Sequence, residues 1–250
     1  MDREPFRHYQ GLKNARTIET ASFLATEQAI DRIRLTTALM AVIGGPGTGK
    51  TFAIRQILRT RSDIDHVWVQ FPMESTPRLV SQKLVEALTG ERLPKIEQNE
   101  ILRQRAIELL QKRKPLVVID EAQNLNKACI EGLRYLHDVS GCSFPMILAG
   151  GDGCWDVLRA ERMLKSRILD FVRHRALSEE EVEEIIPTYH PIYETMNLQL
   201  IKNIDARRCQ GEFRIWAAFT LKLTQLLDKE QRTDPTTDDV EIILETMPEL

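Results

Sequence analysis

Short apolar segments alternate with longer segments of helical periodicity along most of the chain. Five segments have the length and the β-branched content of strands, at residues 39–44, 66–71, 115–120, 144–150 and 169–176. Helical segments lie between them, at about 50–60, 76–90, 97–113 and 125–139. The first, third and fourth apolar segments lack polar positions on either face, which is typical of buried parallel strands. This order predicts a three-layer α/β fold with a parallel five-stranded sheet between helices.

The pattern changes after residue 176, where only helical segments follow. Ser178 and Glu181 have the spacing of a capping box and predict the start of a helix. Pro187 and Pro191 are expected to interrupt the chain, and residues 213–227 place their apolar side chains on one helical stripe. We therefore divide the chain into an N-terminal arm (1–20), an α/β core (21–177) and a small all-helical lid (178–250).

The composition favours one globular protein with a small appendage, because 42% of the 250 residues are hydrophobic and 28% are charged. No apolar run approaches the roughly 18 residues of a bilayer span, and no secretory signal is present. We therefore expect a cytoplasmic protein that does not contact membranes. The four cysteines show no metal-binding spacing and are expected to be reduced thiols.

With a net charge of −3, the protein lacks the overall positive charge that is typical of many nucleic-acid-binding proteins. Basic residues are nevertheless concentrated in two stretches, 103–114 and 155–175. Such stretches are most often solvated helix faces. They are compatible with DNA binding without demonstrating it.

Residues 44–51 read GGPGTGKT and match the phosphate-binding pattern G-x-x-x-x-G-K-[ST]. Glycines allow backbone N–H groups to surround a phosphate, and the helix that begins there directs its positive end toward the anion. A lysine at the seventh position binds β- and γ-phosphate oxygens, and the next hydroxyl binds Mg²⁺. We therefore predict ATP and Mg²⁺ as cofactors. The predicted nucleotide-binding residues are Gly45, Pro46, Gly47, Thr48, Gly49, Lys50, Thr51 and Phe52.

Residues 116–121 read LVVIDE, an apolar strand that ends in two acids. Asp120 is predicted to hold Mg²⁺ together with Thr51, and Glu121 to polarise the water that attacks the γ-phosphate. We accordingly predict an ATPase whose catalytic residues include Lys50, Asp120 and Glu121. Gln123, two residues further on, either belongs to the cap of the next helix or senses the γ-phosphate or a subunit interface.

Three other parts of the expected site depart from the usual pattern or have more than one candidate residue. In ATPases of the AAA+ class the strand after the acidic pair ends in a polar side chain, but Gly151 stands at that place. Either Asp152 substitutes for it or the contact is missing, which would make hydrolysis slow. Arg167 and Arg162 are candidates for an arginine supplied to a neighbouring protomer, and Arg214 could reach the phosphates from the lid.

These motifs, with Ser166-Arg167-Ile168 and Gly211-Glu212-Phe213-Arg214, resemble the AAA+ ATPase subunits of DNA transposition systems. Members of that family include the phage Mu B protein and the TnsC- and TniB-type target selectors. The resemblance extends from about Thr17 to Leu227, and at Ile18-Glu19-Thr20 it implies a contact with adenine. Only the two ATP motifs are specific.

The resemblance implies a homo-oligomer, ring or helical filament, that assembles with ATP around duplex DNA. It further implies that the assembly recruits a DDE-type transposase and is dismantled by ATP hydrolysis. DNA would be held through its backbone, without strong sequence preference and with marked salt dependence. The family places these contacts after the second strand, which here indicates Arg78, Lys83, Arg92 and Lys95. Ordinary surface charge explains these four equally well.

Three alternative functions fit the same motifs. An AAA+ ATPase of a bacterial secretion system carries a similar acidic strand, usually with a membrane span or a peptidoglycan-binding module. A nucleotide-gated scaffold would keep the fold and scarcely hydrolyse ATP. A helicase or initiator loader is expected to carry a winged-helix domain, for which we find no room after the lid.

Overall fold

The computed structural model describes residues 11–93, 98–139 and 141–248 of the chain. It divides into two compact units. One comprises Ala21–Gly45 and Lys50–His174, and the other comprises residues 11–20, Pro46–Gly49 and residues 175–248. We call them the sheet unit and the helical unit.

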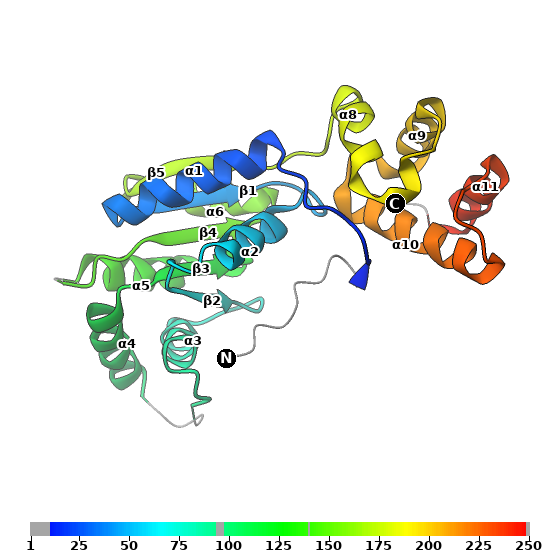
Figure 1. The fold of residues 1–250 in the computed structure, drawn as a ribbon. Helices are drawn as coiled ribbons and strands as arrows, with labels where there is room; N and C mark the ends of the chain where they lie inside the picture. The colour runs from blue at the N-terminus through cyan, green and yellow to red at the C-terminus, as the bar shows by residue number, and fades with distance from the viewer. Residues whose placement is uncertain (1–10, 94–97, 140, 249–250) are drawn as a thin grey trace. The chain divides into compact units, whose positions relative to one another are not determined.

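The sheet unit contains a parallel five-stranded sheet in the order β2-β3-β4-β1-β5 (Figure 1). All its pairs are parallel, so the carboxyl ends of the strands share one edge of the sheet. The predicted α/β fold is therefore confirmed. The strands are β1 (Leu39–Ile43), β2 (His66–Gln70), β3 (Leu116–Asp120), β4 (Met146–Gly150) and β5 (Ile168–Arg173).

Alternate residues of β1 show why the fold has three layers. Leu39, Ala41 and Ile43 pack into a core with α3–α6, whereas Met40 and Val42 pack into a second core with α1 and α2. All five are fully buried, as a central parallel strand requires. The helical elements of this unit are α1 (Ala21–Thr36), α2 (Lys50–Thr60), α3 (Pro77–Thr89), α4 (Asn99–Arg113), η2 (Ala122–Asn124), α5 (Lys127–Asp138), α6 (Asp152–Ala160) and α7 (Arg162–Lys165).

Two expectations about the core require correction. The last strand ends at Arg173 rather than at residue 176, because its partner β1 ends at Ile43, directly opposite Arg173. The pattern analysis also missed α1 and α6. Only Cys154 and Leu158 of α6 are buried, and the five buried residues of α1 are interspersed with charged ones.

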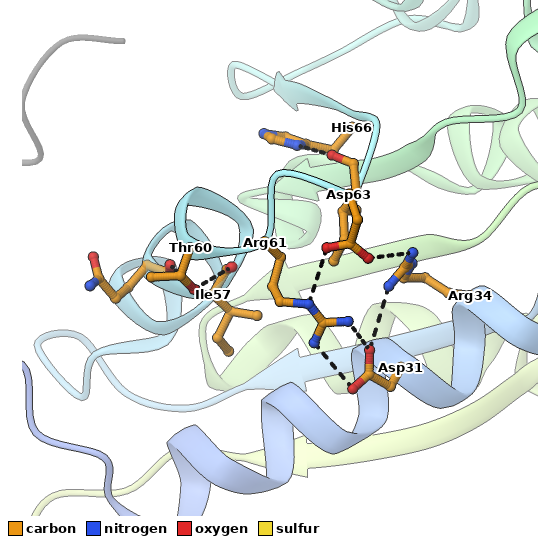
Figure 2. A network of polar contacts seen from close by, with 9 residues as sticks. Asp31, Arg34, Ile57, Thr60, Arg61, Asp63 and His66 are labelled. Carbon is orange, nitrogen blue, oxygen red and sulfur yellow. Dashed lines mark hydrogen bonds and ion pairs between the residues drawn. The ribbon is translucent and has the colours of Figure 1, made fainter.

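A closed ring of four charged side chains lies at the opposite edge of the sheet, beside the amino ends of β1 and β2 (Figure 2). Arg61 follows α2 and binds Asp31 of α1 at 2.9 Å and Asp63 at 3.3 Å. Arg34 completes the ring, at 3.1 Å from Asp63 and 3.6 Å from Asp31. These pairs join α1 to the turn that leads from α2 into β2.

The helical unit consists of helices around a core that includes Trp216, Tyr193 and Phe219. The capping box at its start is confirmed, since the Ser178 hydroxyl accepts from Glu181 N (3.3 Å) and the Glu181 carboxylate accepts from Ser178 N (2.8 Å). Its helical elements are α8 (Glu179–Tyr189), η3 (Pro191–Tyr193), α9 (Leu198–Ile204), η4 (Asp205–Cys209), α10 (Phe213–Glu230) and α11 (Thr237–Thr246).

Pro187 does not interrupt the chain as predicted, because it lies inside α8. It stands two residues before the end of the helix and removes only one backbone hydrogen bond there. Ile186 and Tyr189 are buried on either side of it, and their burial holds the last turn in place.

Residues of the N-terminal arm pack within the helical unit. Arg16 N donates to Tyr189 O at 2.8 Å, and the Arg16 guanidinium pairs with Glu194 at 2.8 Å. A ring nitrogen of His190 lies 3.0 Å from Lys13 O. Residues 13–16 are therefore fixed by backbone as well as side-chain contacts.

Candidate nucleotide-binding site

The glycine-rich segment forms the connection between β1 and α2. Gly47 and Gly49 have φ angles of 77° and 89°, which only glycine adopts without strain. A side chain at Gly47 would also approach Glu212 Oε2 within 2.7 Å and Arg214 Cβ within 3.1 Å. The 11-residue helix α2 begins at Lys50, so its N-terminal amides lie at the end of this loop.

The structure places Lys50, Thr51 and Asp120 at the same edge of the sheet. The Lys50 ammonium donates to Gly44 O and Gly45 O, each at 2.7 Å. The Thr51 hydroxyl lies 3.4 Å from Asp120 Oδ1, although the two residues are 69 positions apart in the chain. This is the arrangement that the two sequence motifs require.

Asp120 is the last residue of β3 and is only 5% exposed. Burial raises the pKa of this carboxyl, and the hydrogen bond from Glu121 N at 3.0 Å offsets part of that rise. A nearby cation would favour the charged form. The Arg55 guanidinium also acts to lower this pKa, but burial has the larger effect. Asp120 has no ion pair within the described residues, so a bound cation would further stabilise its charged form.

The oxygen atoms of Thr51 and Asp120 fit a Mg²⁺ ion that is bound together with a nucleotide. Mg²⁺ typically takes one or two protein oxygens and completes its octahedron with phosphates and water. Within the described ranges, no group of three or more His, Cys, Asp or Glu side chains could hold a metal by itself. The nucleotide would have to supply the remaining ligands.

Glu121 leaves the strand in an unusual backbone conformation, with φ 56° and ψ 42°. This left-handed region costs a non-glycine residue roughly 1 kcal/mol or more and is frequent at functional sites. The Glu121 carboxylate accepts a hydrogen bond from Gln123 Nε2. Gln123 Oε1 in turn accepts from Gly151 N at 3.0 Å.

Asp152 does not supply the polar group that was expected at the end of β4. It is the first residue of α6, is exposed, and lies 3.7 Å from Arg173 in an ion pair. Gln123 instead reaches the backbone of Gly151, the position where the polar residue was expected. Sequence reasoning named Gln123 only as one of two possibilities, and its contact with Gly151 gave no signal in the sequence.

The two arginine candidates for action in a neighbouring protomer have different environments. The Arg167 guanidinium binds both oxygens of Asp138, at 2.7 and 2.8 Å, and also donates to Met163 O. Arg162 begins α7 and is exposed, and no ion pair of Arg162 is found in the part of the chain that the structure describes. Arg162 is therefore the better placed of the two to contact another molecule.

Arg214 and Phe52 are the outlying members of the predicted site. Arg214 lies in the helical unit at the start of α10, is exposed, and donates through its backbone N to Gly47 O at 3.3 Å. Phe52 is half-buried in the first turn of α2.

Two of the predicted DNA-contacting residues lie on different sides of one helix. Arg78 and Lys83 both belong to α3, about 140° apart around its axis at about 100° per residue. Arg92 is exposed beyond the end of that helix, and Lys95 lies outside the described residues. The four cysteines are buried and free of disulfides, and burial raises the pKa of Cys154 to about 12, which makes it an inert thiol.

A glycine-rich segment between a strand and a helix, with its final threonine beside an acid at the end of another parallel strand of the sheet, defines a P-loop nucleotide-binding protein. Residues 33–158 match the family model described as AAA domain, and the chain belongs to that family. No curated protein matches the chain.

Solved structures share the fold at low sequence identity. The Aeropyrum pernix ORC2 protein, solved as ADPNP–ADP complexes, has a TM-score of 0.73 and 13% identity over 94% of this chain and 70% of that chain. The Aeropyrum pernix ORC1 protein in complex with DNA gives 0.70 and 16%, over 92% and 65%. The Thermotoga maritima RuvB Holliday junction branch migration motor gives 0.61 and 19%, over 89% and 67%. Among the residues described here, no helix is both long and apolar enough to cross a membrane.

Proposed function

We propose that this protein binds ATP with Mg²⁺, hydrolyses ATP slowly, and assembles on duplex DNA in its ATP-bound state. The observation that carries the proposal is the Thr51–Asp120 contact of 3.4 Å beside the Lys50 ammonium. It combines a phosphate-binding loop, a hydroxyl and a desolvated carboxylate at one edge of a parallel sheet. Glu121, the next residue, supplies a general base.

Each residue has a distinct part in this chemistry. Lys50 would bind the β- and γ-phosphate oxygens, and Thr51 and Asp120 would hold Mg²⁺, which neutralises developing charge when bound. Glu121 would orient the attacking water in line with the γ-phosphate and accept its proton. Arg162 of a neighbouring protomer would stabilise the transition state, since Arg167 is held by Asp138 within its own subunit.

The DNA component is supported by two independent similarities. One is the likeness of the fold to ORC1, which was solved in complex with DNA, and to the RuvB branch migration motor. The other is the resemblance of the motifs to the ATPase subunits of transposition systems. We therefore propose that the assembly regulates DNA transposition by recruiting a DDE-type transposase, and that ATP hydrolysis disassembles it. Arg78, Lys83, Arg92 and Lys95 are the proposed contacts with the DNA backbone.

A loader-type ATPase that acts on DNA is the second candidate. It is the initiator-loader alternative of the sequence analysis, and the likeness of the fold to ORC2 over 94% of this chain is compatible with it. The two candidates differ in how many protomers bind a duplex. A transposition regulator that forms filaments adds protomers as the duplex lengthens, whereas a loader binds in a fixed number.

The first experiment measures the anisotropy of a labelled random duplex against protein, at two salt concentrations. The protein is tested without nucleotide, with ADP and with a non-hydrolysable ATP analogue. Binding should be strong only with the analogue and should weaken steeply as salt rises. Glu121→Gln should remain on DNA with ATP itself, and Lys50→Ala should not bind. Equal affinity in all three nucleotide states would contradict the proposal.

A second experiment separates the two candidates. Sedimentation of Glu121→Gln with ATP on duplexes of increasing length should show a protomer number that grows with length. A constant number would favour the loader. A transposition regulator must in addition increase strand transfer by its transposase in the presence of ATP, and Lys50→Ala must lose that effect.

A further inference from the structure

The segment that follows β3 is bonded to both neighbouring strands of the sheet. On one side, Asn124 Nδ2 donates to Phe71 O, just beyond β2, at 2.9 Å. On the other side, Gln123 Oε1 accepts from Gly151 N, just beyond β4, at 3.0 Å. Because β2, β3 and β4 are adjacent in the sheet, the short helix η2 is held across the end of β3 from both directions.

Gln123 also uses the other end of its amide. Gln123 Nε2 donates to Glu121 Oε2, so one side chain connects the backbone of β4 with the carboxylate of Glu121. No other hydrogen bond of the Glu121 side chain occurs in the described part of the chain. Its second oxygen, Oε1, therefore remains able to accept a proton from water.

Gly150 makes room for this amide. A side chain at Gly150 would collide with Gln123 Oε1, and it would approach Cys154 Sγ within 2.8 Å. At Gly151 the nearest atom to an added Cβ would be Gln123 Nε2, at 4.0 Å. The absence of a side chain at residue 150 thus allows the Gln123 amide to reach the backbone N–H of Gly151.

We propose that Gln123 is a positioning residue for ATP hydrolysis, which fixes the Glu121 carboxylate relative to the end of β4. It replaces the polar side chain that strand β4 lacks, and it acts through Glu121 rather than on the nucleotide. This inference rests on the proposed ATPase activity. The left-handed backbone of Glu121 occurs together with this contact between its carboxylate and Gln123.

The test compares Gln123→Met, which has a similar length and no amide, with wild type. Turnover should fall roughly 10- to 100-fold, the range typical of a residue that orients a functional group without touching the substrate. The KM for ATP and the affinity for a non-hydrolysable analogue should change less than about 3-fold, since Lys50 and Thr51 are untouched. Gln123→Glu should also lose turnover, because it places a second carboxylate beside Glu121.

Gln104→Ala is the matched control. Gln104 Nε2 donates to Glu108 Oε1 at 3.3 Å on the exposed side of α4, so this variant removes an amide–carboxylate bond that is not part of the site. Its turnover should equal that of wild type. Thermal unfolding of every variant shows whether a loss of turnover accompanies a loss of folding.

A double-mutant cycle with Glu121→Gln distinguishes positioning from a general structural role. If Gln123 acts through Glu121, Gln123→Met should cause no further loss in single-turnover rate on the Glu121→Gln background. An equal fold-loss on both backgrounds, or unchanged turnover in Gln123→Met, would overturn the inference while the ATPase proposal stands. A wild-type protein without any ATP turnover would overturn both.

Discussion

At the carboxyl edge of the sheet Asp120 and Glu121 have neutral hydrogen-bond partners, whereas at the amino edge four charged side chains bind one another. The partners of the first pair are a hydroxyl, an amide and a backbone N–H. In the ring of Figure 2, Arg61 and Arg34 each pair with both Asp31 and Asp63. The same residue types therefore have different surroundings at the two ends of parallel strands.

The pKa directions follow this difference. Burial raises the pKa of Asp120, whereas the Arg61 guanidinium lowers the pKa of Asp63. A carboxylate compensated within the chain stabilises the fold and has little left to offer a ligand. One that is buried without an ion pair is costly until a ligand supplies the charge. The comparison thus separates a candidate functional edge from a structural one.

The largest expected effect comes from Lys50→Ala. The ammonium is the positive group that touches the loop carbonyls of Gly44 and Gly45, and its removal should weaken ATP binding by at least about 100-fold, or about 2.7 kcal/mol. Calorimetric titration with ATP and Mg²⁺ measures the loss. Lys112→Ala, at an exposed position of α4, is the control. Unchanged affinity in Lys50→Ala would refute the assigned phosphate site.

Arg162→Ala should have the next largest effect, a loss of turnover of about 1000-fold with ATP affinity retained, if Arg162 acts on a neighbouring protomer. Arg167→Ala should instead lower Tm by about 2–4 °C, because it breaks the pair with Asp138. Mixing Arg162→Ala with Glu121→Gln subunits should restore part of the turnover, since a mixed interface can combine one intact Glu121 with one intact Arg162. Mixtures as inactive as their components would exclude action between subunits.

Asp120→Asn should reduce Mg²⁺-dependent turnover roughly 10- to 100-fold and yet raise the Tm of the nucleotide-free protein by a few °C at neutral pH. The sign follows from the raised pKa. In the folded protein this carboxyl holds its proton above its ordinary value of 3.8, so its contribution to stability is present below that pH and is lost as the pH rises.

Thermal unfolding from pH 4 to 7 tests this expectation. The stability advantage of Asp120→Asn should grow with pH over that interval. A Tm below that of wild type at pH 7 would show that the buried carboxylate is compensated within the chain after all.

The placement of the two ATP motifs at one edge of the sheet was predictable from sequence because each motif is contiguous. Residues 44–51 require a loop after a strand, and the acids at 120–121 require the end of another strand, so both follow from local pattern. The contact of Gln123 with Gly151 was not predictable, because it depends on strand order and on the absence of a side chain at residue 150. The choice between Arg162 and Arg167 likewise depended on Asp138, which is distant in sequence.

The fold shows the same division between local and long-range information. Strands β1, β3 and β4 were evident because they are apolar on both faces. Helix α1 was missed because its five buried residues are interspersed with charged ones. Two of these charged residues, Asp31 and Arg34, belong to the ring at the amino edge, and their partners Arg61 and Asp63 lie about 30 positions away.

Arg61→Ala should have the smallest effect. It tests whether the ring at the amino edge contributes to stability alone, without influence on the candidate site at the carboxyl edge. The ring is solvated, so its loss should lower Tm by only about 1–3 °C and should matter less as salt rises. ATP affinity and turnover should stay at wild-type values, because no atom of the ring belongs to the carboxyl edge. If Arg61→Ala instead changed turnover without changing Tm, charge at the amino edge would influence the site through α2, which runs from Lys50 to Thr60 between them. Measuring Tm and turnover on the same preparation, at low and at high salt, therefore decides whether the two edges are independent.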